Sequence, residues 1–238
     1  MPLCRLRLIL YLAIIFSTCG ASLEQAVAEN RFEPAIRKFE ELDRQHPPEK
    51  GRVLFVGSSS IRLWNLKKSF PELDAINRGF GGSHISDSID FAERIVLKYK
   101  PRTVLLYAGD NDIAAGKPTD EVVGDFKRFA NIVHQALPET RLLFLAIKPS
   151  IRRWELVDRM RQANERIEAY TKQHAYLGYV DIFEPMLGAD GTPMKSLFIA
   201  DGLHLNAKGY ALWTEIVEPY LVAAERSSKG QPRREGAP

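Results

Sequence analysis

The 238-residue sequence predicts one α/β domain built on a largely parallel sheet. Short apolar runs that are typical of buried strands alternate with segments whose apolar residues recur at helical spacing. Small and polar turn residues follow several of these runs directly. The sequence shows no internal repeat and no second set of core residues, so we expect a single domain.

The predicted sheet has five strands. Each is a short apolar run beside a turn signal, and most are rich in Val, Ile, Leu or aromatic residues. Because helical segments separate successive strands, we expect the strands to run parallel. The predicted strands are residues 53–56, 75–77, 103–107, 141–147 and 178–182.

The predicted helices have apolar residues at intervals of three and four positions. Pro47 ends the first of them and Pro101 the second. Thr119 and Asn206 are candidate N-caps, since their side chains can accept hydrogen bonds from the first turn of a helix. The helices are expected over residues 30–44 and 85–99, with three more that begin near Thr119, Leu156 and Asn206.

Residues 1–21 are predicted to be a secretory signal peptide. Arg5 and Arg7 precede a short apolar run, residues 8–16, and small residues follow it. This run is shorter than the roughly 20 residues that a membrane-spanning helix needs, and an uncleaved anchor is the alternative interpretation. Cleavage after Ala21 or Ala28 would give a periplasmic or secreted protein.

The two cysteines, Cys4 and Cys19, both lie within the predicted signal peptide. Its removal would leave a domain without cysteine, so we expect neither a disulfide nor thiol chemistry. Cys19 could instead be the lipidated residue of a bacterial lipoprotein, and a membrane partner is expected only in that case. Beyond the leader we expect a helix and linker at 22–50, the main domain at 51–224 and a disordered tail at 225–238.

The charge of the chain does not favour nucleic-acid binding. The formal net charge is +3, and several of the cations lie near the two ends of the chain. Domains that bind nucleic acid show a basic stripe with interleaved aromatic residues, and the sequence has none. We therefore expect no nucleic-acid partner.

Four turns that follow predicted strands carry polar residues with possible chemical roles. The loops at the carboxyl ends of parallel strands lie at one edge of the sheet. Residues that are far apart in the sequence are therefore expected to meet there. The first three turns are residues 57–60, 81–83 and 109–112, and the fourth, residues 201–204, lies within a long loop, 183–205, after the fifth strand.

The residue types in these turns fit acyl transfer. A serine on the first turn is a weak nucleophile that needs an adjacent base, and His204 could be that base. Asp201 could fix the tautomer of the imidazole and stabilise its charged form. A negative oxygen on the substrate needs hydrogen-bond donors, for which the backbone N–H groups of Ser59 and Gly82 and the side-chain amide of Asn111 are candidates.

The first turn resembles the first sequence block of the SGNH hydrolases, also called GDSL-type esterases. It is most similar to the branch of platelet-activating-factor acetylhydrolase-like proteins. The block of an apolar residue, Gly, Asp and Ser matches residues 55–59, which implies Ser59 as the nucleophile rather than Ser58 or Ser60. Ser58 stands where the family usually has an acidic residue, and Ser83 stands where an Asp is common.

The other three blocks of this family follow in the same order. The resemblance extends over residues 51–221 and implies that Gly82 and Asn111 are oxyanion-hole residues, while Asp201 and His204 complete the catalytic triad. We expect a flavodoxin-like three-layer α/β/α sandwich with strand order 2-1-3-4-5. The implied activity is hydrolysis of carboxylic esters through an acyl-enzyme, without metal or cofactor.

The substrate class is less closely defined by the sequence. Small-molecule, polysaccharide and lipid esters all fit, and we favour short acyl groups because there is no separate lid domain or long apolar insertion. An exported O-acyltransferase with the same triad is the alternative, followed by a non-catalytic binding module. His84, Lys148, Arg152 and Trp154 could bind substrate, although each could equally be structural, and Asp201 with His204 could instead ligate a metal.

Overall fold

The computed structural model describes residues 30–229, and the burial of side chains as far as Leu221. From Arg31 onward these residues belong to one unit. The predicted signal peptide, with Cys4 and Cys19, lies outside the described residues, as do residues 22–29 and 230–238. Within the described part, none of the helices has the length and apolar character needed to cross a membrane.

The sheet confirms the predicted fold. Its five strands are all parallel and are ordered β2-β1-β3-β4-β5. Every residue of β1 and β3 is buried, which explains why the central strands are continuous apolar runs without alternation. The strands are β1 (Val53–Gly57), β2 (Ile76–Gly79), β3 (Thr103–Tyr107), β4 (Arg141–Leu145) and β5 (Leu177–Val180).

Gly57 ends the central strand β1 at a point where only glycine fits. It pairs in register with Gly79 of β2 and Tyr107 of β3, so the three strands end level with one another. Its φ is +133°, and a Cβ atom on this residue would collide with the carbonyl oxygen of Tyr107. The turns after these strands therefore begin side by side.

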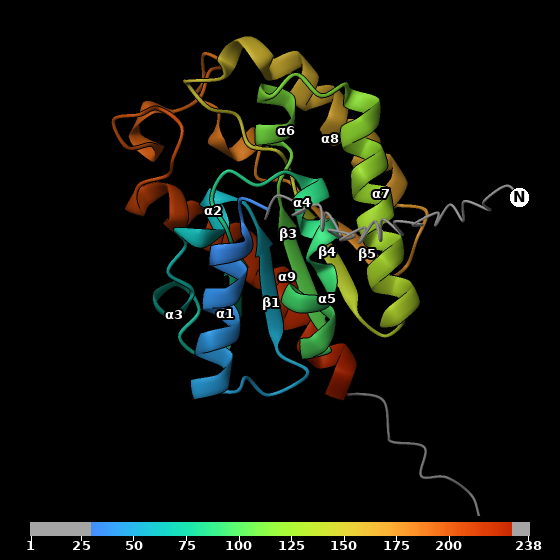
Figure 1. Ribbon diagram of the computed structural model, residues 1–238. Coiled ribbons are helices and arrows are strands. Elements are labelled where there is room, and N and C mark those ends of the chain that lie inside the picture. Colours follow the sequence, from blue (N-terminus) through green and yellow to red (C-terminus); the bar gives the residue numbers. More distant parts are fainter. Residues whose placement is uncertain (1–29, 230–238) are drawn as a thin grey trace, which may run out of the picture. The chain divides into compact units, whose positions relative to one another are not determined.

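Helices cover both faces of the sheet (Figure 1). One face carries α1, α4, α5, α7 and α8, among which α1 contacts α5, α4 contacts α7, and α7 contacts α8. The other face carries α9, which contacts α3. This division follows from right-handed crossovers, because the chain turns back over β1 after β2 and continues across the sheet from β3 to β5.

The helices have the following bounds. Two short helices, α2 (Ser59–Arg62) and α6 (Asp110–Ala114), lie at the carboxyl ends of β1 and β3. The 3₁₀ turns are η1 (Leu97–Tyr99), η2 (Trp154–Leu156), η3 (Glu184–Met186) and η4 (Lys195–Leu197). The remaining α-helices are α1 (Glu33–Gln45), α3 (Leu66–Ser69), α4 (Ile85–Asp90), α5 (Ala92–Ile95), α7 (Thr119–Ala136), α8 (Val157–Thr171) and α9 (Ala207–Lys229).

Three local predictions need correction. The helix expected over residues 85–99 is broken at Phe91, which lets α4 and α5 turn separate apolar faces, including Ile89 and Ile95, into the core. Thr119 is the first residue of α7, and Pro118, whose φ of −56° suits a helix start, occupies the N-cap position. Residues 225–229 are helical rather than disordered, because the run of Ala and charged residues from 223 to 226 favours a helix.

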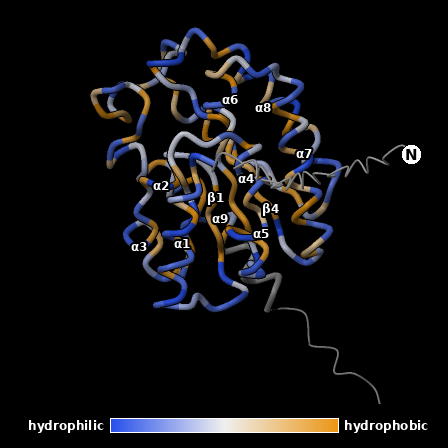
Figure 2. The backbone as a smooth tube through the Cα atoms, in the orientation of Figure 1, coloured by the Kyte–Doolittle hydropathy of each residue, from blue (hydrophilic) through white to orange (hydrophobic). Residues whose placement is uncertain are grey.

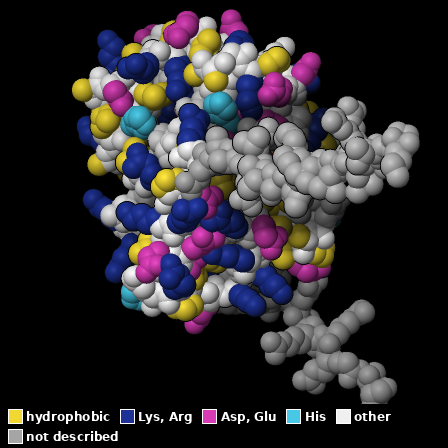
Figure 3. Space-filling model, in the orientation of Figure 1, with side chains coloured by type: hydrophobic (Ala, Val, Ile, Leu, Met, Phe, Trp, Pro, Cys, Tyr) yellow, Lys and Arg dark blue, Asp and Glu magenta, His cyan; other side chains and the backbone are white. Residues whose placement is uncertain are grey.

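The apolar core lies on both sides of the strands, and Figure 2 shows the hydrophobic colouring concentrated along the sheet. On the α9 face, Trp213 is fully buried, with its ring centroid 5.0 Å from that of Tyr107 and 5.5 Å from that of Trp64. On the surface shown in Figure 3, cationic and anionic side chains are interspersed. An example is Arg94, which pairs with Glu33 and Glu40 of α1 and holds that helix against α5.

Candidate active site

The turn after β1 presents Ser59 at the carboxyl edge of the sheet. The N–H of Ser58 donates a 3.0 Å hydrogen bond to the carbonyl oxygen of Tyr107, so the chain leaves β1 against the end of β3. Ser58 and Ser60 are buried, whereas Ser59 is half-buried. The Oγ of Ser59 lies 3.0 Å from Nε2 of His204, so Ser59 is the serine of this turn that contacts an imidazole.

Asp201 and His204 are joined within the loop that precedes α9. Asp201 Oδ2 lies 2.6 Å from His204 Nδ1, and Oδ1 accepts hydrogen bonds from the backbone N–H groups of Leu203 (2.8 Å) and His204 (2.9 Å). Burial alone would raise the pKa of Asp201, but these hydrogen bonds outweigh it and lower the pKa to about 2. Asp201 is therefore ionised near neutral pH and orients the ring with Nε2 toward Ser59.

Gly82 lies in the turn after β2, beside the turn that carries Ser59. The N–H of Phe80 donates a 2.9 Å hydrogen bond to the carbonyl oxygen of Gly57, which holds the two turns together. Gly82 adopts a φ of +80°, a conformation that favours glycine. Among the described residues, neither the N–H of Ser59 nor that of Gly82 has a hydrogen-bond acceptor, so both can donate to a substrate.

Asn111 lies in the first turn of α6, directly after β3. Gly109, with a φ of +114°, turns the chain from the strand into this helix. The side-chain Nδ2 of Asn111 donates a 3.0 Å hydrogen bond to the carbonyl oxygen of Ser83, the residue after Gly82. The structure thus brings together the four turns that the sequence placed at this edge, with Ser59, Gly82, Asn111, Asp201 and His204.

Asp112 fixes α6 from beneath. Its side chain is fully buried and lies 3.1 Å from Nζ of Lys117. Both carboxylate oxygens accept from the N–H of Ile85 at 3.3 Å, which ties α6 to the start of α4. Burial raises the pKa of Asp112, and the positive charge of Lys117 opposes that rise. The residue therefore has a structural role beside Asn111.

Asp110 lies on the other side of Asn111 and is also buried. Its Oδ2 accepts a 2.9 Å hydrogen bond from Nη1 of Arg153 and lies 3.6 Å from Nζ of Lys148. Arg153 also donates from Nη2 to Oδ1 of Asn111 at 3.0 Å. The sequence carries no signal for Arg153, because this residue lies in a loop without periodicity, next to a second arginine, Arg152.

Of the four residues predicted to bind substrate, Lys148 does not line an open pocket. Its side chain is 1% exposed and its Nζ lies over the ring of Tyr107, because the extended chain after β4 turns it inward toward Asp110. Burial lowers the pKa of Lys148, and the negative charge of Asp110 opposes that shift. Lys148 is therefore part of the buried layer beneath the site.

The other three predicted binding residues lie nearer the surface. His84 is half-buried at the start of α4, where its N–H donates to Asp87 Oδ2 at 2.7 Å. Trp154 is half-buried in η2, and no described residue makes an aromatic contact with it. Arg152 is exposed, and its backbone N–H donates to the carbonyl oxygen of Gly202 at 3.0 Å. Of these three residues, Arg152 lines a hollow that reaches Asp201.

That hollow has a volume of about 450 Å³ and reaches Asp201. Apolar and cationic side chains share its lining, which is formed by Ile151, Arg152, Lys195, Phe198 and Ile199 together with Ala200, Asp201 and Gly202. It could therefore admit part of an ester beside Asp201. None of the other predicted site residues lines it.

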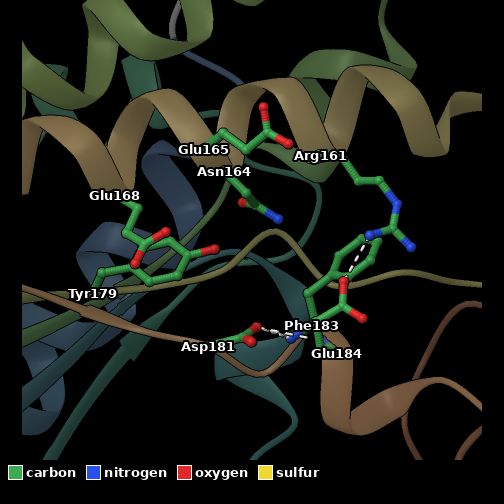
Figure 4. A pocket seen from close by; sticks show the side chains of 8 residues that line it. All are labelled: Arg161, Asn164, Glu165, Glu168, Tyr179, Asp181, Phe183 and Glu184. Atoms are coloured by element: carbon green, nitrogen blue, oxygen red, sulfur yellow. Dashed lines mark hydrogen bonds and ion pairs between the residues drawn. The ribbon is translucent and has the colours of Figure 1, made fainter.

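A second hollow, of about 170 Å³, lies between α8 and the residues after β5 (Figure 4). It is acidic, with Glu165, Glu168, Asp181 and Glu184 in its lining. Arg161 lies within it, paired with Glu184 at 2.6 Å and stacked 4.5 Å from the centroid of the Phe183 ring. In the described part of the chain, no three His, Cys, Asp or Glu side chains form a metal-binding group.

Comparison with known proteins identifies the family. The profile of the GDSL-like Lipase/Acylhydrolase family matches residues 63–212. This range contains Gly82, Asn111, Asp201 and His204 but begins after Ser59, which joins the site through its contact with His204.

Individual relatives agree with this assignment. Human platelet-activating factor acetylhydrolase IB subunit alpha1 is 25% identical over 91% of this chain and 94% of its own length. A GDSL-like lipase from Bacteroides thetaiotaomicron has a TM-score of 0.69 and 21% identity, covering 81% of this chain and 98% of its own. A family 3 carbohydrate esterase from Clostridium thermocellum has a TM-score of 0.60 and 18% identity, covering 76% and 100%.

The family match spans more than half of the chain, and the solved structures share its fold. The protein belongs to the GDSL-like lipase/acylhydrolase family and is a carboxylic ester hydrolase.

Proposed function

We propose that the protein hydrolyses carboxylic esters through an acyl-enzyme intermediate on Ser59. The observation that carries this proposal is the continuous hydrogen-bonded chain of Asp201, His204 and Ser59, with distances of 2.6 Å and 3.0 Å. A nucleophile, a base and a carboxylate that orients the base are the three parts of serine-based acyl transfer. The unpaired N–H groups near Ser59 add the donors that such a reaction needs.

The reaction proceeds in two stages. Ser59 Oγ attacks the ester carbonyl carbon while His204 Nε2 takes the hydroxyl proton, and the resulting oxyanion accepts hydrogen bonds from the N–H groups of Ser59 and Gly82 and from Asn111 Nδ2. The bond to the alcohol oxygen then breaks, and His204 returns the proton to that oxygen. In the second stage His204 deprotonates a water molecule, which attacks the acyl carbon. The bond from that carbon to Ser59 Oγ then breaks, His204 returns the proton to Oγ, and the carboxylic acid leaves.

Short acyl esters are the substrate class that we propose. The human relative is named an acetylhydrolase, and the chain covers nearly its whole length. A panel of p-nitrophenyl esters from acetate to laurate would test this, with acetylated xylan and a 2-acetyl phospholipid as natural esters. We expect kcat/KM to fall as the acyl chain lengthens, and a maximum at long chains would contradict the proposal.

The Ser59→Ala variant tests the nucleophile. We expect kcat to fall at least about 10⁴-fold, and we expect the variant to lose covalent labelling by a fluorophosphonate probe. Ser58→Ala is the matched control, since Ser58 is the buried neighbour whose hydroxyl has no hydrogen-bond partner among the described residues. Hydrolysis or labelling at the wild-type level in Ser59→Ala would reject the proposal.

We also propose that the protein is exported, on the pattern of residues 1–21. The N-terminal sequence of the protein recovered from its native host would test this directly. A mature N-terminus after Ala21 or Ala28 supports a soluble exported protein, and a lipidated Cys19 supports a membrane-anchored one. An intact N-terminus on a cytoplasmic protein would contradict export.

A further inference from the structure

Arg153 connects the buried layer beneath the site to the side chain of Asn111. Its Nη1 donates to Asp110 Oδ2 at 2.9 Å and its Nη2 donates to Asn111 Oδ1 at 3.0 Å. The side chain of Arg153 is only 17% exposed and that of Asp110 is 6% exposed. A planar guanidinium holds two acceptors in a fixed relative position, so these two neighbouring side chains are held as one unit.

These contacts determine which way the amide of Asn111 faces. Oδ1 accepts from Arg153, and Nδ2 donates to the carbonyl oxygen of Ser83 at 3.0 Å. A flipped amide would place its NH₂ group against the guanidinium donors and its oxygen against the Ser83 carbonyl, so both hydrogen bonds would be lost. In the observed orientation, the second Nδ2 hydrogen has no acceptor among the described residues and is available to a substrate.

The charge of Arg153 also acts on this amide. A cation on Oδ1 draws electron density from the amide and makes the Nδ2 hydrogens stronger donors. The guanidinium itself is held by Asp110, which is in turn within 3.6 Å of the buried Lys148. Asp110 therefore keeps the guanidinium against Oδ1 of Asn111, and the proximity of this cation polarises the amide.

The backbone at Arg153 is attached to the other half of the site. The N–H of Arg152, the preceding residue, donates to the carbonyl oxygen of Gly202 at 3.0 Å. Gly202 lies between Asp201 and His204 in the loop that carries the base. The segment at Arg153 therefore contacts the loop of the base through its backbone and Asn111 through its side chain.

We propose that Arg153 is a positioning residue that orients and polarises the Asn111 amide so that it can stabilise the oxyanion. This inference rests on the proposed function, because it assumes that Asn111 is an oxyanion donor. The inference predicts that loss of Arg153 reduces stabilisation of the transition state much more than it reduces binding of the substrate.

The first test compares Arg153→Gln and Arg153→Lys with a matched control, Arg159→Gln. Arg159 Nη1 also donates to α6, at the carbonyl oxygen of Ile113, but Arg159 does not contact Asn111. Removal of one oxyanion donor lowers kcat by roughly 10²–10³-fold, so misorientation of the donor should lower it about 10–100-fold. We expect this loss of kcat in Arg153→Gln, with KM within about threefold of wild type, and a smaller loss of kcat in Arg153→Lys. In the control Arg159→Gln, kcat should change less than about threefold.

The second test is a double-mutant cycle with Asn111→Ala. If Arg153 acts through Asn111, Arg153→Gln should lower kcat by no more than about twofold once Asn111 is replaced. Millimolar guanidinium should partly restore kcat in Arg153→Ala but not in the double variant. Additive losses in the cycle, wild-type kcat in Arg153→Gln, or wild-type kcat in Asn111→Ala would each overturn the inference.

These outcomes are distinct from failure of the proposed function. If Ser59→Ala keeps wild-type activity, the acyl-enzyme proposal itself fails. If Ser59→Ala is inactive and Arg153→Gln is unchanged in kcat, only the role of Arg153 is rejected. Thermal unfolding of each variant separates loss of folded protein from loss of turnover, and a pH profile that keeps its shape in Arg153→Gln would show that the base is unaffected.

Discussion

Helix α6 and the loop of residues 201–204 hold the two halves of the site in different ways. Asn111 on α6 lies in sequence between two buried carboxylates, Asp110 and Asp112. Asp110 is paired with Lys148 and Arg153, and Asp112 accepts from the N–H of Ile85 as well as pairing with the nearby Lys117. In the loop, Asp201 accepts its hydrogen bonds from Leu203 and His204, which are its own close neighbours. Asp201 is also partly exposed, with a third of its side chain accessible.

This difference indicates that stability and chemistry are separated within one site. Removal of a buried partner from α6 leaves polar groups without compensation, which destabilises the fold. Removal of a partner in the exposed loop has little effect on folding but disturbs the orientation of His204, the proposed base. Variants on the two sides should therefore fail in opposite ways.

The largest effect is expected in the loop, from Asp201→Asn. The NH₂ group of the new amide can donate to Nδ1 of His204, which favours the tautomer with its proton on Nε2. That nitrogen could then not take the proton of Ser59, so kcat should fall roughly 10³–10⁴-fold. The free energy of unfolding should change by less than about 1 kcal/mol, because the side chain is partly exposed. Steady-state kinetics and chemical denaturation of the same preparation would check both values, and a large loss of stability would remove the contrast.

An intermediate effect of the opposite kind is expected for Asp112→Asn on α6. The buried carboxylate of Asp112 accepts from the N–H of Ile85 and pairs with Lys117. In the variant, Lys117 would still have its ion pair with Asp125, at 3.0 Å. We expect the free energy of unfolding to fall by about 2 kcal/mol, with kcat of the folded fraction within about tenfold of wild type. A fall in kcat as large as that of Asp201→Asn would show that the two regions are not separable.

The smallest effect is expected in the pH dependence of stability. The pKa of Asp201 is about 2 in the folded protein, below its usual value of 3.8, so the unfolded chain binds more protons between these values. The stability that Asp201 contributes is therefore complete above about pH 4 and is lost as pH falls toward 2. The difference in free energy of unfolding between wild type and Asp201→Asn should shrink as pH falls through this window, by less than about 1 kcal/mol. A difference in free energy of unfolding that does not change with pH would show that the ionisation of Asp201 does not contribute to stability.

The sheet could be predicted from the sequence because buried parallel strands leave a strong local pattern. The run of β3, Thr103–Tyr107, was assigned with the bounds that the structure shows. Turn residues directly after β1 and β3 also indicated that Ser59 and Asn111 meet at one edge, and the long loop after β5 was expected to bring His204 to the same edge. These predictions rest on topology, which places such turns together whatever the loops between them contain.

Contacts between side chains from different elements could not be predicted. Arg152 and Arg153 are adjacent and alike in sequence, yet Arg153 is half-buried and donates to Asn111, whereas Arg152 is exposed. Lys148 was expected near the substrate, whereas its Nζ is buried beside Asp110. The break at Phe91 likewise depends on packing rather than on the local pattern.

The collision that a side chain at Gly57 would cause has a consequence for the evolution of this site. The hydroxyl of Ser59 could be exchanged for a thiol and the chain would still fold, since that change alters no backbone angle. At position 57 even alanine would have to push β3 away from β1. A deep mutational scan should therefore show a position that tolerates no other residue, two residues before the proposed nucleophile Ser59, although the atoms of Gly57 itself take no part in the proposed reaction.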